Sequence, residues 1–119
     1  MGNLWIGPGA TADWHDRTMI IEQGILHVVP GQEDDFELAM DEAKDIIAAM
    51  PGFRRLQVSR GVEHPGTYLL LAEWDTLEDH TEGFRGSPEY EHWRGLLHHF
   101  YDPFPVIEHF APKVTIDKV

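Results

Sequence analysis

Histidine is the residue type with the clearest chemical potential in this chain of 119 residues, which contains eight of them. Imidazole can move protons near neutral pH and can bind metals. No histidine pair combines the i, i+4 spacing of helical metal ligands with a third ligand nearby, so we predict no metal site unless the fold brings His80, His98 and His109 together. The simpler alternative is partly buried imidazoles that hydrogen-bond to backbone or acid, such as His109 beside Glu108.

Many aromatic residues lie in the C-terminal half of the chain, and they could form a flat apolar pocket. Trp74 ends a predicted strand where the chain turns into a helix, and Trp93 lies on the helix expected to cover the sheet there. Two indoles so placed could hold an aromatic ligand. The alternative is ordinary core packing, favoured for Trp93 because Tyr90, Trp93 and Leu97 form one helical stripe. Other aromatic residues close by in the sequence are Phe84, Phe100, Tyr101 and Phe104.

The segment Gly83-Phe-Arg-Gly-Ser-Pro88 could bind an anion at the start of a helix. A helix N-terminus offers free N–H groups and the positive end of a dipole, and Arg85 and Ser87 stand just before it. A carboxylate, phenolate or phosphate could dock there. The alternative is that Arg85 pairs with one of the many acidic residues.

Composition excludes several classes of function. The net charge of −12 argues against nucleic-acid binding, which needs a basic patch. The absence of cysteine removes thiol catalysis, Cys-based zinc sites and iron–sulfur clusters, and it fits a reducing compartment, so we expect a cytoplasmic protein. No apolar run is long enough to span a membrane, and no signal peptide is evident. No P-loop, GxGxxG, nucleophile elbow or Ser-His-Asp order occurs.

The elements that must position these residues follow from periodicity. The β-rich segment 19–29 predicts a strand that stops at Pro30-Gly31. From Glu33 the apolar residues recur with helical spacing until Pro51-Gly52, and the acidic residues fall mostly on the outer face, which we interpret as solvated. This apolar stripe consists of Phe36, Met40, Ala43, Ile47 and Met50. Segments 53–60 and 68–74 predict a hairpin.

The C-terminal half predicts two helices and a last strand. Thr76 with an acid three residues later is a capping box for a short helix through His80, which Gly83 would break. Ser87-Pro88 predicts the start of a helix over about 89–99, and segment 106–110 predicts a short strand.

The resulting order is βαββαβ, an α+β class fold with one antiparallel sheet and helices on one face. The bare face predicts a homodimer, with Ile21, Ile25, Leu69 and Leu71 buried between subunits. We expect residues 1–18 to form an irregular arm, residues 19–110 the domain, and residues 111–119 a tail that reaches across the dimer.

Several segments, in order, resemble the antibiotic biosynthesis monooxygenase (ABM) family of ferredoxin-like dimeric α+β barrels. They are Met19-Ile-Ile-Glu-Gln-Gly24, Val29-Pro-Gly-Gln32, Met50-Pro-Gly-Phe53, Tyr68-Leu-Leu-Leu-Ala-Glu-Trp74 and Phe84-Arg-Gly-Ser-Pro-Glu-Tyr90, followed by Trp93. The resemblance covers residues 19–110 and implies a small-molecule site. Members include cofactor-independent oxygenases of polyketide phenols, haem-degrading enzymes and quinol-handling enzymes.

The resemblance also separates two branches of this family. The haem-degrading branch uses an Asn on the first strand, a Trp at the end of the third and a His on the last helix. Trp74 matches, but Gly24 stands at the Asn position, His92 is out of register and His98 lies further along. The phenol-oxidising branch requires only an apolar pocket, a donor for the anion and access to O₂.

The leading hypothesis is therefore a homodimeric monooxygenase that acts with O₂ on an aromatic or quinone-like substrate without bound metal or flavin. Haem degradation and a non-catalytic ligand-binding dimer are the alternatives. In the leading hypothesis His80 or His98 moves the proton, and the substrate-binding residues are Trp74, Phe84, Arg85, Ser87, Trp93 and Tyr101.

Overall fold

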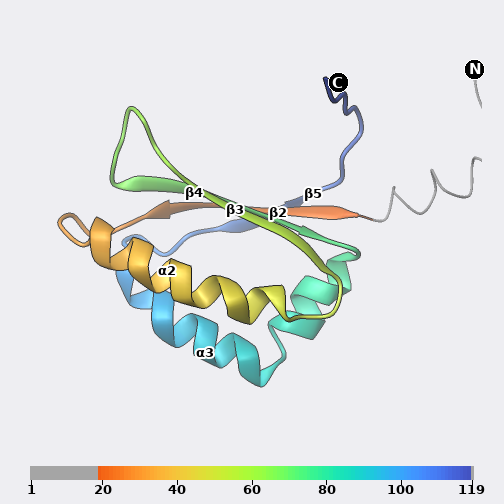
Figure 1. The fold of residues 1–119 in the computed structure, drawn as a ribbon, viewed down its shortest axis with the longest axis horizontal. Coiled ribbons are helices and arrows are strands. Elements are labelled where there is room, and N and C mark those ends of the chain that lie inside the picture. Colours follow the sequence, from red (N-terminus) through yellow and green to blue (C-terminus); the bar gives the residue numbers. More distant parts are fainter. Residues whose placement is uncertain (1–18, 119) are drawn as a thin grey trace, which may run out of the picture.

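A four-stranded sheet carries its helices on one face only, as seen in the computed structural model, which describes residues 19–118 (Figure 1). The arm expected over residues 1–18 lies outside the described residues. In chain order the elements are β2 (Ile20–His27), α2 (Glu33–Ala48), β3 (Phe53–Arg60), β4 (Thr67–Trp74), the π-helical turn η1 (Asp79–Phe84), α3 (Pro88–Leu97), the 3₁₀ turn η2 (His98–Phe100) and β5 (Ile107–Phe110). Within 19–118, no helix is long and apolar enough to cross a membrane.

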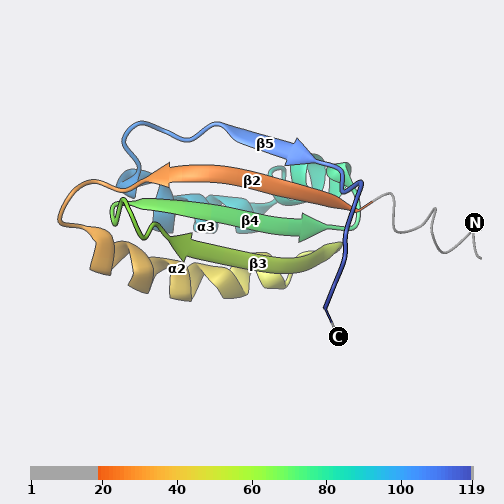
Figure 2. The same ribbon diagram turned by 90° about the horizontal axis from the view of Figure 1, so that it is seen from above.

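The strand order is β3-β4-β2-β5, and every neighbouring pair is antiparallel (Figure 2). The predicted ferredoxin-like α+β fold is therefore confirmed. β2 lies between β4 and β5, so a residue of β2 has a partner on both sides; Glu22, for example, is opposite Ala72 on β4 and His109 on β5. This register brings residues from both ends of the chain onto one face of the sheet.

The predicted helix and turns at the start of the domain are present. Four residues of the predicted stripe, Phe36, Met40, Ala43 and Ile47, are the buried residues of α2. Gly31 and Gly52 both have positive φ angles, 89° and 81°, which glycine tolerates without a Cβ penalty. Pro30-Gly31 and Pro51-Gly52 therefore end their elements as the sequence indicates.

The segment after β4 differs from the sequence prediction. Thr76 does cap the turn, because its Oγ1 accepts the backbone N–H of Asp79 at 3.1 Å. Gly83, however, does not break the helix and lies within η1, a wide turn in which the N–H of Arg85 bonds the carbonyl of His80 at 3.1 Å. This wider turn directs both His80 and Phe84 toward the sheet, where they are buried.

The last helix and strand are also shorter than predicted. α3 starts at Pro88 and ends at Leu97, and the chain then tightens into η2 rather than continuing to His99. The Ser87 cap is as predicted, with its side chain accepting the N–H of Tyr90. The final strand begins at Ile107, one residue later than expected.

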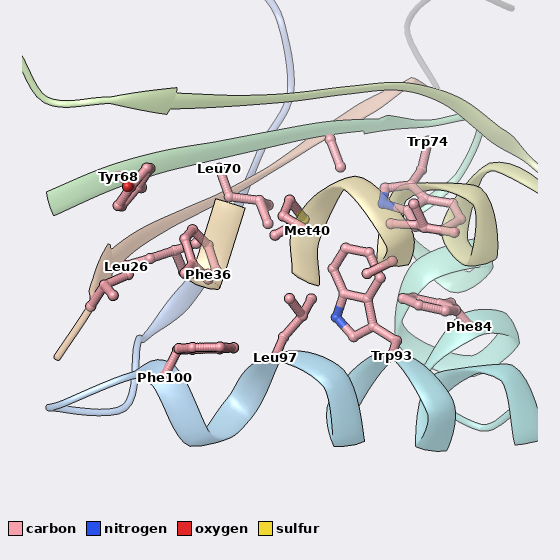
Figure 3. Close-up of a cluster of buried hydrophobic side chains, with 14 residues drawn as sticks. Leu26, Phe36, Met40, Tyr68, Leu70, Trp74, Phe84, Trp93, Leu97 and Phe100 are labelled. Carbon is pink, nitrogen blue, oxygen red and sulfur yellow. The ribbon is translucent and has the colours of Figure 1, made fainter. Parts of the chain in front are cut away.

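A single apolar core fills the space between sheet and helices (Figure 3). It combines residues of one face of β2 and β4 with the inner faces of α2 and α3. Its members are Leu26, Val28, Phe36, Met40, Ala43, Ile47, Tyr68, Leu70, Ala72, Trp74, Phe84, Trp93, Leu97 and Phe100. Burial of this much apolar surface is the main favourable term in folding.

The opposite face of the sheet is uncovered by helices (Figure 1). Its residues alternate with the buried ones along β2 and β4, as period-two geometry requires. Ile21, Ile25, Leu69 and Leu71 all lie on this open face, and Phe110 joins them opposite Ile21. Ile25 and Phe110 are 39% and 46% exposed.

Candidate functional site

A cavity of about 430 Å³ lies between the helix-facing side of β2 and β5, the turn η1 and helix α3. Its volume falls within the range typical of small-molecule sites. Nine of its thirteen lining residues are aromatic or aliphatic, and the other four, Glu22, His80, Arg85 and His98, are titratable and come from several elements. The lining residues are Glu22, Leu26, Leu70, His80, Phe84, Arg85, Tyr90, Trp93, His98, Tyr101, Phe104, Pro105 and Ile107.

Glu22 is the buried acid of this cavity and is only 7% exposed. Its Oε1 accepts the indole N–H of Trp74 at 3.0 Å and lies 3.4 Å from Nε2 of His80. Both contacts fall on the same oxygen. Within residues 19–118, Oε2 has no hydrogen-bond partner, so one oxygen of a buried carboxyl group is available to a ligand.

His80 links Glu22 to His109. The Nδ1 of His80 and the Nε2 of His109 are 2.8 Å apart, a hydrogen bond between two imidazoles. His80 is 2% exposed, whereas His109 is half-buried on β5. The sequence interpretation that placed His109 beside Glu108 is therefore wrong, because successive residues of a strand point to opposite faces and His109 shares the inner face with Glu22.

Burial favours the neutral forms of all three groups. It raises the pKa of Glu22, an effect that the hydrogen bond from Trp74 and the charge of Arg85 partly offset. Burial lowers the pKa of His80 to about 3, helped by the charges of Arg85 and His109. The pKa of His109 is also lowered, mainly by burial and then by Arg85. A carboxylic acid facing two neutral imidazoles can pass protons without creating a lasting buried charge.

The aromatic residues converge from three elements, but they have different positions (Figure 3). Phe84 and Trp93 line the cavity, with their ring centroids 5.6 Å apart. Trp74 is completely buried and is not a lining residue. It lies behind the wall, stacked on His80 and tilted against Phe84 at centroid distances of 5.5 and 5.8 Å. Tyr101 lines the cavity, while Phe100 belongs to the core.

Of the two residues predicted to bind an anion, Arg85 and Ser87, only Arg85 lines the cavity. Arg85 lines the cavity and is exposed, and within 19–118 no acidic side chain pairs with it within 4.0 Å. Ser87 is not a lining residue. Its hydroxyl donates to the carbonyl of Phe84 at 2.6 Å and accepts the N–H of Tyr90, so it is used in capping α3.

His98 lies apart from the pair formed by His80 and His109. It lines the cavity beside Tyr101 and Phe104, with ring centroids 5.9 and 4.9 Å away. Burial lowers its pKa, and the charge of Arg94 adds to this effect. The fold thus joins two of the three candidate histidines directly, and no group of three potential metal ligands occurs among residues 19–118.

Sequence reasoning missed one member of the site, Glu22, and named His109 only as a histidine that the fold could bring to His80 and His98. A signal for Glu22 was present: period-two alternation places Glu22, Gly24 and Leu26 on the same face as Val28, which is the apolar inward face. An acid at an inward position is unusual and marks a candidate site. His109 carried no such signal, because its position depends on the pairing of β5 with β2.

A larger hollow of about 680 Å³ between α2 and β3 is a weaker candidate. Its rim carries the charged residues Glu37, Asp41, Lys44, Asp45 and Arg60, all of them exposed. Several already pair with one another, as Lys44 does with Asp41 and Arg60 with Glu37. Exposed charges of this kind are screened by water and orient a ligand poorly.

Gly24 occupies the inner face of β2 next to the cavity. A Cβ at this position would lie 2.6 Å from Cδ1 of Ile107 on β5, so the end of the Ile107 side chain would have to move to make room for it. Gly24 therefore supplies no side chain to the cavity at the position where the resemblance to the family places the Asn of the haem-degrading branch.

The structure is a ferredoxin-like α+β domain with a cavity between helices and sheet whose volume is in the range of small-molecule sites. Comparison with known sequences assigns the family: the model of the antibiotic biosynthesis monooxygenase family matches residues 19–96, and the chain belongs to this family. A relative in Bacillus subtilis, the uncharacterized protein YczJ, is 52% identical over 92 residues, covering 77% of this chain and 97% of the relative.

Solved structures agree with this assignment. A putative antibiotic biosynthesis monooxygenase from Bordetella bronchiseptica is similar with a TM-score of 0.78 and 29% identity, covering 82% of this chain and 99% of that one. SnoaB from Streptomyces nogalater, a cofactor-independent oxygenase, has a TM-score of 0.68 at 18% identity, covering 85% of this chain and 99% of its own. At that identity the second comparison supports the fold alone.

Proposed function

We propose that this protein is a monooxygenase that acts with O₂ on a small aromatic substrate, a phenol or hydroquinone, without a bound metal or flavin. The observation that carries the proposal is the buried carboxyl group of Glu22, which faces an aromatic-lined cavity with its Oε2 unpartnered among the described residues. A phenolic hydroxyl is a hydrogen-bond donor on an aromatic ring, so it matches both the polar and the apolar part of this site.

The chemistry would draw on the substrate itself. Loss of the hydroxyl proton gives a phenolate, whose electrons can reduce O₂; the ring gains one oxygen atom and the second leaves as water. Overall, a phenol with a ring C–H and one O₂ yields a quinone and one H₂O. Arg85 would stabilise the phenolate, and the apolar wall would limit water. His80, joined to Glu22, is the better placed of the two predicted proton carriers.

Family membership supports the class of reaction, and the description of SnoaB as a cofactor-independent oxygenase supports the absence of a prosthetic group. Phe84, Trp93 and Tyr101 would contact the ring from α3 and its flanking turns. Trp74 would act from behind, by holding Glu22 and His80 in place. Ser87 is omitted because its hydroxyl is used within the helix cap.

We also propose that the working unit is a homodimer. The open face of the sheet carries an apolar stripe that would be costly to leave in water, and isologous pairing of this face in two copies would cover it. The segment after β5 turns toward this open side (Figures 1 and 2), and its Val114 and Ile116 are 93% exposed. A partner subunit would cover these side chains as well.

A thermal-shift screen tests the proposal. The protein, dialysed against a chelator, is titrated with naphthols, hydroquinones, their methyl ethers and haem. Phenols and hydroquinones are expected to raise the melting temperature, because a ligand that binds only the folded state must stabilise it. The methyl ethers lack the hydroxyl proton and should stabilise less. Bound phenols are then tested for O₂ consumption and quinone formation.

Three outcomes would change the proposal. Stabilisation by phenols without O₂ consumption would indicate a non-catalytic ligand-binding dimer. Tight one-to-one haem binding followed by reductant-dependent loss of its absorbance would indicate haem degradation. Equal stabilisation by phenols and their ethers would remove the role of Glu22 in recognising the hydroxyl.

A further inference from the structure

We propose that Glu22, His80 and His109 form a proton relay that carries the hydroxyl proton of a bound phenol from the cavity to solvent at the β5 side of the sheet. This inference rests on the proposed function and extends it to His109, which does not line the cavity. It begins from one open acceptor atom, Oε2 of Glu22, and from two contacts that continue the path: the 3.4 Å approach of Oε1 to His80 and the 2.8 Å bond from His80 to His109.

The path has two distinct ends. Glu22 and His80 line the cavity, and they are 7% and 2% exposed, so neither can exchange protons freely with bulk water. His109 does not line the cavity and is half-buried on β5. Among residues 19–118, its Nδ1 has no hydrogen-bond partner. The proton therefore enters at a buried carboxyl group and leaves from an imidazole that reaches solvent.

Hydrogens can be assigned so that every bond along the path has a donor. In the resting state Glu22 is a carboxylic acid whose Oε1–H donates to Nε2 of His80, and the Nδ1–H of His80 donates to Nε2 of His109. Trp74 donates its indole N–H to the same Oε1 at 3.0 Å. Each buried group is neutral in this arrangement, which avoids the cost of a buried charge.

Proton transfer then balances without any change of oxidation state. The substrate O–H bond breaks, its electron pair stays on oxygen, and an O–H bond forms at Oε2 of Glu22. The proton on Oε1 moves to His80, that on Nδ1 of His80 moves to His109, and His109 releases its Nδ1 proton to water. The products are a phenolate beside Arg85 and one hydrated proton. Glu22 and His80 return to neutral forms, with their protons on the opposite atoms.

The experiment uses 4-nitrophenol, whose phenolate is yellow and whose neutral form is colourless, in weakly buffered solution acidic enough to keep the free dye neutral. Stopped-flow mixing measures how fast the yellow form appears on binding. Wild type should ionise the dye. Glu22→Gln keeps the shape but cannot accept the proton, so the dye should bind and stay colourless.

His109→Gln breaks the path outside the cavity and should slow ionisation about tenfold or more, within the range for loss of one proton-transfer group. Added imidazole should restore much of the rate, which a purely structural role would not allow. His99→Gln replaces an exposed histidine of η2 that lies outside the cavity; it is the matched control and should behave as wild type.

The outcomes separate the two proposals. A dye that binds but stays colourless in wild type overturns the relay and leaves the phenol site standing. The relay alone is also overturned if the His109→Gln protein ionises the dye as fast as wild type, or if added imidazole does not restore its rate. A dye that does not bind wild type overturns the phenol site and the relay together. Circular dichroism of each variant confirms that it is folded.

Discussion

The indole of Trp74 stacks on the imidazole of His80, with ring centroids 5.5 Å apart and planes inclined by 26°. The same indole donates its N–H to Glu22 at 3.0 Å. One fully buried side chain thus contacts both Glu22 and His80 without lining the cavity itself. The residue that the sequence analysis assigned to substrate contact supports the site from behind.

Trp74→Phe should therefore lower stability first. The smaller ring leaves a gap, and the buried Oε1 of Glu22 loses a donor, a combination expected to cost about 1–3 kcal/mol. Urea denaturation measures this loss, and phenol titration of the folded protein measures binding. We expect weaker binding because His80 and Glu22 lose their alignment. A variant with unchanged stability and reduced binding would place Trp74 in direct contact with the ligand after all.

Stability should fall as the pH falls from about 6.5 toward 3. Because burial lowers the pKa of His80 to about 3, the unfolded chain binds a proton in this window that the native protein does not. The slope is at most about 1.4 kcal/mol per pH unit for each such histidine. His80→Gln should flatten the dependence, whereas His92→Gln, on the exposed side of α3, should not.

The contribution of Glu22 to the pH dependence of stability has the opposite sign to that of His80. Burial raises its pKa above the usual 4.5, so its contribution to stability is present below that pH and decreases as the pH rises through the raised value. Comparing His80→Gln with wild type across the series isolates the histidine. Identical slopes for the two proteins would show that His80 binds its proton equally well in the native and unfolded states, and that burial does not lower its pKa.

Leu71→Arg should prevent formation of the proposed dimer and leave a monomer. Leu71 lies on the open face between Gln23 and Gln57, where an arginine would bring two charges into the proposed interface. Light scattering at micromolar concentration measures the mass. Leu38→Arg is the control, because Leu38 is 72% exposed on α2, away from the sheet. A wild-type protein that is monomeric at this concentration would refute the proposed assembly.

Arg85→Ala should selectively lower the affinity of the protein for acidic ligands. Arg85 lines the cavity as an exposed cation, and a charge-assisted hydrogen bond to a ligand anion is worth roughly tenfold in affinity. Calorimetric titration with a naphthoate and a neutral naphthamide measures the selectivity. Arg94→Ala, on α3 and paired with Glu91, should leave both affinities unchanged. Equal losses for the two ligands would assign Arg85 a structural role.

Local sequence patterns are enough to predict the helices and strands and which side of each is buried. Period-two alternation in β2 and β4 separates Leu26 and Leu70 from Ile25 and Leu69, and the stripe from Phe36 to Ile47 defines the buried side of α2. These features are local, because backbone geometry alone decides which neighbours share a face. The order βαββαβ and the family segments then suffice for the fold.

Which side chains contact one another depends on the tertiary structure. His80 and His109 are 29 residues apart, and Glu22 and Trp74 are 52 apart, so no local pattern could join them. Their contacts depend on the register of β2 with β4 and β5 and on the wide turn η1, which directs His80 inward. Burial, in turn, sets the protonation of these groups, and burial is a property of the packed chain rather than of the sequence around each residue.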